Sequence, residues 1–210
     1  MRIEVKNVSK RFKKVTVLED VNLDLEEGNI YGIIGRNGSG KSVLLKLLCG
    51  FYDSSQGTIY YDGIDLKSRG LFPPSTRSLI EKPNFLPNFT GLENLKILAK
   101  IQNIISEEDI IETLKRVNLY EDRNKKYSEY SLGMKQKLGI AQVLMENPKV
   151  MILDEPFNGI EDETATNIRK LLLEEKKKNK IIIIASHIKE DIEKLANVVY
   201  KVDGGKISKV

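Results

Sequence analysis

Residues 35–42 have the composition and spacing of a loop that binds phosphate groups. They are Gly35, Arg36, Asn37, Gly38, Ser39, Gly40, Lys41 and Ser42, which fit the pattern G-x-x-x-x-G-K-[ST]. Glycines let the backbone wrap closely around an anion, so that successive N–H groups point at it. Lys41 adds a positive charge for β- and γ-phosphates, and the Ser42 hydroxyl is a ligand for Mg²⁺. The loop therefore predicts binding of a nucleoside triphosphate with Mg²⁺.

Two acidic residues, Asp154 and Glu155, directly follow the hydrophobic run 150–153. Burying two negative charges at the end of a strand is costly unless a cation is present. Asp154 can hold Mg²⁺ through water, and Glu155 can polarise the water that attacks a phosphate. A surface turn without chemistry is the simpler alternative, but the phosphate-binding loop upstream favours the catalytic interpretation.

His187 is the only histidine, and it lies just beyond a second hydrophobic run, residues 181–185. Ligands of open α/β sheets bind beyond the carboxyl ends of the strands. A lone histidine is more often structural than functional. Here the run 181–185 is expected to neighbour the phosphate-binding loop, where a neutral imidazole could donate a hydrogen bond to the γ-phosphate and respond to its loss.

The elements that must position these residues alternate between strands and helices. We expect buried strands at residues 30–34, 150–153, 181–185 and 198–202, and helices at 41–49, 162–178 and 188–195. Buried strands separated by helices indicate a parallel sheet with helices on both faces.

Two further regions have patterns of their own. In residues 3–34 the β-forming side chains gather in the runs 3–8, 15–18 and 21–25, and residues 57–66 predict short strands around a turn. From 90 to 145 the pattern is helical, in about three segments, and it opens on a capping box formed by Thr90 and Glu93.

These patterns predict one α/β domain that spans residues 1–210. Its core would comprise residues 1–89 and 146–210, with a mostly parallel sheet and an N-terminal antiparallel β part. The helical region 90–145 would be a lobe inserted into that core.

Composition excludes several classes of protein. Hydrophobic residues make up 40% and charged residues 30%, which favours a folded core over disorder. The net charge of +4 is too small to indicate a nucleic-acid partner. No hydrophobic run approaches the roughly 20 residues of a spanning helix, and the first residues lack a signal-peptide pattern. We therefore expect a cytosolic protein that reaches a membrane only through a partner.

With these motifs in this order, the chain resembles the ATP-binding cassette ATPases over nearly its whole length. The resemblance implies a P-loop NTPase core, and it places Phe12 where the family keeps an aromatic residue that stacks on adenine, with Val17 beside the ring. Residues 130–137 look like the family signature, in which Ser131 and the backbone near Gly133 form a second anion site. His187 matches the switch histidine of the family.

The resemblance also implies an activity and partners. The activity is ATP hydrolysis coupled to transport, with Glu155 and His187 as catalytic residues and Ser42, Glu81 and Asp154 at the Mg²⁺ ion. Two copies of the chain would sandwich two ATP molecules, because the signature of one subunit closes over the γ-phosphate of the other. A membrane-spanning permease would hold the pair on the cytoplasmic side of the membrane.

Three departures from the family pattern are informative. Leu132 replaces a glycine of the signature, and Glu161 stands where the loop after Glu155 usually ends in aspartate. Glu81 replaces a glutamine that touches Mg²⁺ and reports to the membrane subunit. With the Ser-Leu-Gly-Met signature that starts at Ser131, Glu81 resembles the subgroup that exports bacitracin and lantibiotics. The alternative is a generic cassette for another substrate, in which Glu81 has no special role.

Other functions within this family fit less well. DNA-repair relatives need a long coiled coil between the phosphate loop and the signature, and translation relatives carry two cassettes in one chain. A regulatory cassette that holds ATP without hydrolysing it remains an alternative, but the intact Lys41, Asp154, Glu155 and His187 argue against it.

Overall fold

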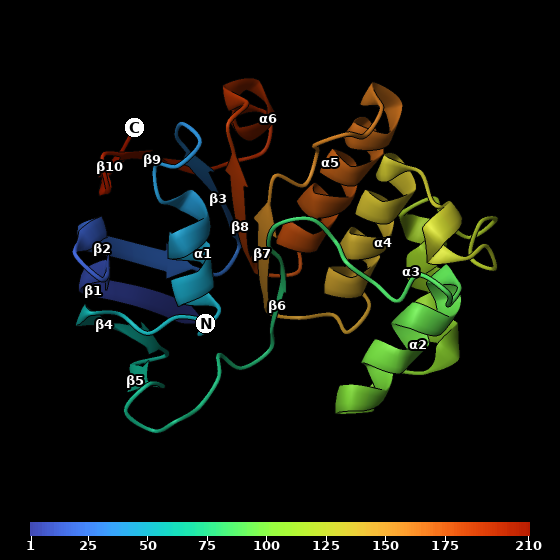
Figure 1. The fold of residues 1–210 in the computed structure, drawn as a ribbon, viewed down its shortest axis with the longest axis horizontal. Helices are drawn as coiled ribbons and strands as arrows, with labels where there is room; N and C mark the ends of the chain where they lie inside the picture. The colour runs from blue at the N-terminus through green and yellow to red at the C-terminus, as the bar shows by residue number, and fades with distance from the viewer.

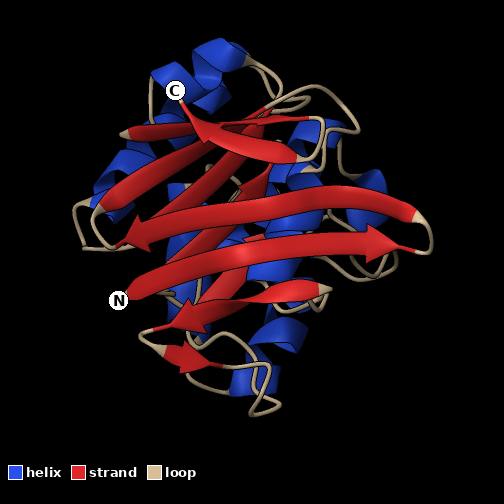
Figure 2. Ribbon diagram, turned by 90° about the vertical axis from the view of Figure 1, so that its left-hand side faces the viewer, coloured by secondary structure: helices blue, strands red, loops and turns tan.

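A computed structural model describes residues 1–210, and its strands form two sheets (Figures 1 and 2). The strands are β1 Arg2–Phe12, β2 Val15–Glu26, β3 Asn29–Ile34, β4 Gln56–Tyr61, β5 Ile64–Asp65, β6 Thr76–Leu79, β7 Val150–Asp154, β8 Ile181–Ser186, β9 Val198–Asp203 and β10 Lys206–Lys209. The helices are α1 Lys41–Leu48, α2 Gly91–Gln102, α3 Glu107–Arg116, α4 Leu132–Leu144, α5 Asp162–Lys176 and α6 Lys189–Glu193, with a short 3₁₀ turn at Tyr127–Glu129.

The larger sheet is the mostly parallel one that the sequence predicts. Its strand order is β10-β9-β3-β8-β7-β6, and only the β9–β10 pair is antiparallel. Every residue of β7 and β8 is buried. Along β8, Ile181 and Ile183 pack in one hydrophobic cluster and Ile182 and Ile184 in the other, so the sheet is covered on both faces.

Helices cover the two faces of this sheet unequally. Helix α1 lies between the two sheets, with Leu44, Leu45 and Leu48 fully buried there (Figure 1). Helices α4, α5 and α6 cover the other face, and α2 and α3 lie outside α4 (Figure 1). The expected capping box is present, because Thr90 accepts from the Glu93 N–H and Glu93 accepts from the Thr90 N–H. The division into core and inserted lobe stays a prediction.

The smaller sheet is antiparallel, with the order β2-β1-β4-β5. It differs from the sequence prediction in one respect, because the runs 15–18 and 21–25 form a single strand, β2. Glu19 and Asp20 interrupt the hydrophobic alternation between these runs. The register of β1 against β2 shifts near Val8, and Asp20 has a positive φ of 48°. Irregular pairing of this kind lets one strand continue across the interruption.

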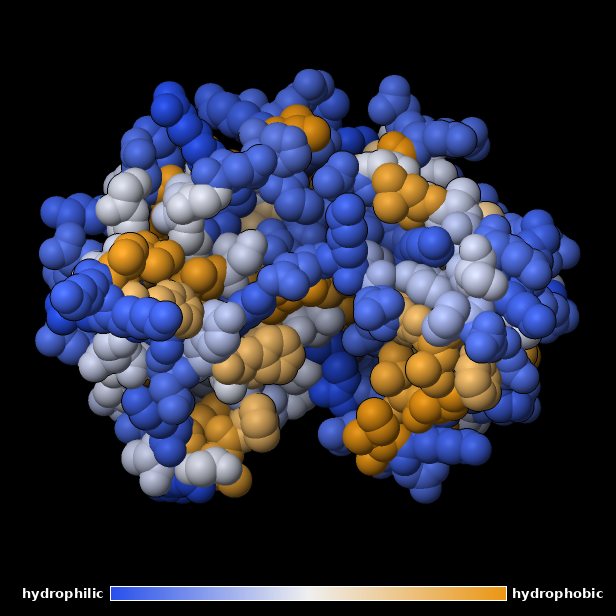
Figure 3. Space-filling view, viewed as in Figure 1, coloured by the Kyte–Doolittle hydropathy of each residue, from blue (hydrophilic) through white to orange (hydrophobic).

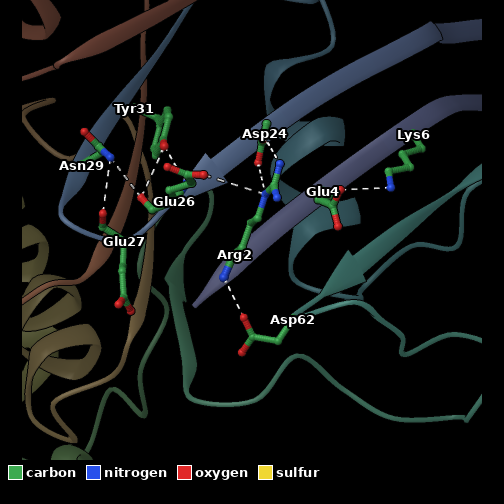
Figure 4. Close-up of polar contacts among 9 residues, drawn as sticks. All are labelled: Arg2, Glu4, Lys6, Asp24, Glu26, Glu27, Asn29, Tyr31 and Asp62. Atoms are coloured by element: carbon green, nitrogen blue, oxygen red, sulfur yellow. Dashed lines mark hydrogen bonds and ion pairs between the residues drawn. The ribbon is translucent and has the colours of Figure 1, made fainter.

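A polar network joins this antiparallel sheet to the parallel one (Figure 4). The Arg2 side chain donates from Nε to Asp24 at 2.7 Å, and its backbone N–H donates to Asp62 at 2.7 Å. The buried Tyr31 of β3 accepts through its hydroxyl from the Glu26 N–H of β2, at 2.6 Å. Exposed ion pairs stabilise little, so among these polar contacts the buried Tyr31 hydrogen bond is the one that adds to the hydrophobic packing of α1 between the sheets.

A buried ionic cluster ties α3 to the end of α5 and the start of β8. The side chain of Glu175 is only 1% exposed and accepts hydrogen bonds from Arg116, Lys178 and Lys180. Burial alone would raise the pKa of Glu175, but these hydrogen bonds outweigh it and lower the pKa to about 2. Burial lowers the pKa of Lys180, which means that keeping this lysine charged is costly. The cluster therefore stabilises the folded protein less than the pKa of Glu175 alone would suggest.

We expect Glu175→Gln to lower the free energy of unfolding by about 2 kcal/mol at neutral pH. The contribution of a carboxylate with a depressed pKa is complete above the unfolded-state value of 4.5 and is lost as the pH falls through about 2. Urea denaturation at several pH values measures it, with the exposed neighbour substitution Glu174→Gln as control. An equal effect of both substitutions at neutral pH would contradict the role of the cluster.

Candidate nucleotide-binding site

The phosphate-binding loop connects β3 to α1 at the carboxyl end of the parallel sheet. Gly38 and Gly40 have φ angles of +77° and +111°, which only glycine adopts at little cost. A Cβ atom on Gly40 would also lie 3.1 Å from the Val17 carbonyl oxygen. Gly40 is the residue before α1, so the positive end of that helix faces the space that the loop encloses.

Lys41 is a buried cation without an acidic partner. Its side chain donates to the carbonyl oxygens of Gly35 at 2.8 Å and Arg36 at 3.3 Å, and the residue is only 6% exposed. A buried charge is costly unless an opposite charge compensates it. The loop is therefore arranged to accept an anion next to Lys41.

Ser42 and Asp154 meet at the start of α1 and the end of β7. The Ser42 hydroxyl donates to Asp154 Oδ2 at 2.6 Å. Burial raises the pKa of the Asp154 carboxyl, and the nearby charge of Glu155 adds to this, while the hydrogen bond from Ser42 opposes it. A cation would relieve the cost of the buried carboxylate. Hydroxyl and carboxylate oxygens are the ligands that Mg²⁺ prefers, so these residues fit the ion.

Glu155 and His187 lie in direct contact, which the sequence did not predict. Glu155 has a positive φ of 49°, and its Oε1 lies 2.9 Å from His187 Nδ1. The same oxygen accepts from the His187 backbone N–H at 3.0 Å, and Oε2 accepts from the Ser186 hydroxyl at 3.2 Å. Ser186 ends β8, so the end of one strand fixes the carboxylate that follows the neighbouring strand.

A cavity of about 320 Å³ brings most of the predicted residues together. Its lining consists of Val17, Asn37, Gly38, Gly40, Lys41, Ser42, Val43, Glu81, Asp154 and Glu155. Glu81 lies at its rim, after the end of β6, with a φ of +65° and its carboxylate paired with Lys46 of α1. The cavity therefore combines the loop with its cation Lys41, the oxygen atoms of Ser42 and Asp154 that suit a metal ion, and the Glu155 carboxylate, which could polarise a water molecule.

The remaining predicted residues lie elsewhere. Gly35, Arg36 and His187 line a second cavity, which shares Asn37 with the first. Ser39 is part of the loop, and its hydroxyl is buried without a hydrogen-bond partner. Phe12 is 38% exposed and makes an edge-to-face contact with Tyr52, with ring centroids 5.3 Å apart.

Ser131 and Gly133 line a third, separate cavity at the start of α4. The Ser131 hydroxyl accepts from the Met134 N–H at 3.2 Å and so caps the helix. The structure thus confirms that a helix opens at this motif. It does not place Ser131 beside the phosphate-binding loop of the same chain.

Sequence reasoning missed four residues around the site. Val43 lines the main cavity, Lys46 pairs with Glu81, and Tyr52 contacts Phe12. Gln136 of α4 donates to the carbonyl oxygens of Glu155 and Pro156 at 3.2 and 3.1 Å. Position relative to the motifs gave a signal for Val43, which directly follows Ser42, and for Gln136, which lies within the signature-like stretch 130–137.

Comparison with known families identifies this arrangement. The ABC transporter family matches residues 18–158, a stretch that contains the phosphate-binding loop, the motif at Ser131 and the acidic pair. The chain belongs to the ABC transporter family. The sequence-based assignment to the ATP-binding cassette ATPases is therefore confirmed.

Relatives from this ABC transporter family match nearly the whole chain. An uncharacterised ABC transporter ATP-binding protein of Bacillus subtilis is 42% identical over 205 residues, covering 98% of this chain and 94% of the relative. A bacitracin transport ATP-binding protein of Enterococcus faecalis is 38% identical over 94% of this chain, which spans 65% of that protein. A lantibiotic transport ATP-binding protein of Streptococcus pyogenes is 34% identical, with 98% and 88% covered.

Solved structures support the same fold. The ATP-binding subunit of an ABC transporter superposes with a TM-score of 0.90 at 26% identity, covering 100% of this chain and 90% of that one. An ABC transporter cassette in its ADP conformation gives 0.83 at 26% identity, with 99% and 90% covered. This ABC transporter protein is thus an ATP-binding and ATP-hydrolysing subunit. None of its helices is long and apolar enough to cross a membrane.

Proposed function

We propose that this ATPase powers the export of an antimicrobial peptide, or self-immunity to one, as the motor of a transporter. The observation that carries the proposal is Glu81, a carboxylate at the rim of the nucleotide cavity where the family normally has glutamine. Two relatives that match most of this chain are named for bacitracin and lantibiotic transport, which supports the same substrate class.

In the proposed site, Lys41 and the loop backbone bind the phosphates of ATP, and Phe12 and Val17 bind the adenine. Ser42, Glu81 and Asp154 would hold Mg²⁺, which would neutralise charge on the phosphates. Glu155 polarises the attacking water, and its contact with His187 keeps the carboxylate oriented.

The proposed partner is a membrane-spanning permease that holds the subunit on the cytoplasmic side of the membrane. Hydrophobic atoms gather over α2 on the face shown in Figure 3. The exposed residues there include Ile97, Ile101 and, just after the helix, Ile104, with exposed fractions of 38%, 74% and 62%. Exposed apolar side chains that gather into one patch mark protein–protein or membrane contact sites, whereas single scattered ones do not. A second copy of the ATPase would complete the assembly.

Peptide resistance of cells tests the proposal. Cells that carry the ATPase with its permease are expected to tolerate more bacitracin or lantibiotic than cells that carry the Lys41→Ala variant. Tolerance of an unrelated small antibiotic should be equal. Equal sensitivity to every peptide in the panel would contradict the proposed substrate class and leave the ATPase assignment intact.

Glu81→Gln is expected to make ATP binding several-fold less dependent on Mg²⁺. The substitution removes one negative charge near the triphosphate, and the penalty of that charge is largest when no metal is present. ATP titrations across a series of Mg²⁺ concentrations measure this, with the exposed Glu121→Gln as control. Basal hydrolysis should change little, because Glu155 remains, while peptide resistance should fall. Identical Mg²⁺ dependence and resistance in both versions would remove the role of Glu81.

A further inference from the structure

Lys46 contacts both Glu81, at the rim of the nucleotide cavity, and the aromatic residue Tyr52 outside it. It lies on α1, five residues after Lys41, and its ammonium forms an ion pair with the Glu81 carboxylate. The Lys46 side chain is 21% exposed and the Glu81 side chain 66%. The Lys46 side chain is therefore largely packed against the protein, whereas the Glu81 side chain is mostly exposed to solvent.

The surroundings of Lys46 extend toward the proposed adenine site. Its ammonium lies 5.5 Å from the centroid of the Tyr52 ring, and Tyr52 is in edge-to-face contact with Phe12. Lys10 lies over both rings, 4.8 Å from Phe12 and 5.2 Å from Tyr52. Cations over aromatic faces are attracted by the ring electrons, so Tyr52 helps to fix the position of the Lys46 ammonium group.

The backbone of Glu81 is in a conformation that needs support. Its φ of +65° lies in the left-handed region, which is unfavourable for a residue with a side chain. The pair with Lys46 is the one ion pair of this carboxylate. The contact therefore stabilises the segment after β6 in a conformation in which the Glu81 carboxylate faces α1.

Three carboxylates lie close together around the cavity, so the charge of Glu81 is less unfavourable when a cation pairs with it. Glu81, Asp154 and Glu155 all line the space that would hold a triphosphate. Lys41 faces the phosphate-binding loop, and Lys46 is the cation that meets Glu81. Without Lys46, the charge of Glu81 would act on the triphosphate with less compensation.

We infer that Lys46 is a positioning residue for Glu81. In the metal-free subunit it holds the carboxylate against α1 and compensates its charge, and Mg²⁺ with ATP must compete with Lys46 for that carboxylate. The inference rests on the proposed role of Glu81 at the nucleotide. Lys46 thereby sets how strongly ATP binding depends on the metal.

A double-mutant cycle with ATP binding as the readout tests the inference. The proteins are the wild type, Lys46→Met, Glu81→Gln and the double variant, each titrated with ATP in chelator and across a Mg²⁺ series. In chelator, Lys46→Met is expected to weaken ATP binding about 5-fold in the wild-type background and about 2-fold or less in the Glu81→Gln background. With saturating Mg²⁺ the effect of Lys46→Met should be small in both.

Two further variants separate positioning from general charge effects. Lys46→Arg keeps the ion pair and should restore metal-free binding. Lys10→Met removes a cation from the same aromatic rings without touching Glu81, and should act equally with and without Glu81→Gln. Thermal unfolding of each variant shows whether a weak binder is simply unfolded, in which case Lys46→Arg carries the test.

The outcomes distinguish the inference from the function it rests on. Equal effects of Lys46→Met in both backgrounds would overturn the role of Lys46 while the role of Glu81 stands. No effect of Glu81→Gln on the Mg²⁺ dependence would overturn the role of Glu81 itself. An effect of Lys46→Met confined to the wild-type background, with rescue by arginine, supports the positioning role.

Discussion

Lys41→Ala is expected to weaken ATP binding about 1000-fold, because it removes the charge that faces the bound phosphates. Lys41 is buried and is held only by the carbonyl oxygens of Gly35 and Arg36. These contacts orient its ammonium without neutralising it, so its full charge is available to a phosphate. Removing one partner of a buried charge pair leaves the other uncompensated, which is the reason for the large effect.

Isothermal titration with ATP and Mg²⁺ measures this loss directly. Lys177→Ala, on an exposed position at the end of α5, changes the net charge equally and should bind ATP as the wild type does. A Lys41→Ala protein that is folded and binds ATP with unchanged affinity would exclude the phosphate-binding role of the loop.

The parts of the fold that could be predicted are those that local sequence determines. The run 181–185 has no polar residue, and it forms β8 with every side chain buried on one of two faces. Thr90 and Glu93 form the expected capping box because both partners lie within one helical turn. The continuity of β2 could not be predicted, because Glu19 and Asp20 break its pattern and only pairing with β1 carries the strand across them.

In the candidate site, too, features set by local sequence could be predicted and contacts between distant segments could not. Residues 35–42 form one contiguous motif, and most of them line one cavity, while their role in phosphate binding stays a prediction. Contacts between distant segments were out of reach: Glu155 with His187, Glu81 with Lys46, and Gln136 with the backbone of Glu155. Each depends on how β7, β8 and the helices pack, and neither periodicity nor motif spacing specifies which side chains then meet.

Glu155→Gln is expected to slow ATP hydrolysis about 1000-fold while ATP binding stays intact, because the proposed general base is lost and the phosphate-binding loop is not. Glu155 is fixed by Ser186 and His187, so its carboxylate has a defined direction from which to polarise a water. Glutamine keeps the shape of the side chain but cannot take up the proton. Phosphate release measures the rate, and Glu174→Gln, on an exposed position of α5, is the control. A variant that hydrolyses ATP at the wild-type rate would show that another group activates the water.

The same variant should accumulate as an ATP-bound dimer. Ser131 and Gly133 line a cavity separate from the phosphate-binding loop of their own chain, so in the proposed sandwich they contact ATP held by a second copy. ATP then joins the two subunits, and hydrolysis releases them. Light scattering of Glu155→Gln is expected to show a dimer with Mg²⁺ and ATP and a monomer with ADP. Adding Ser131→Arg should keep the protein monomeric with ATP, because the larger side chain would fill the space that the γ-phosphate bound to the second copy would occupy. A monomer at saturating ATP, or a tight dimer without nucleotide, would contradict the sandwich.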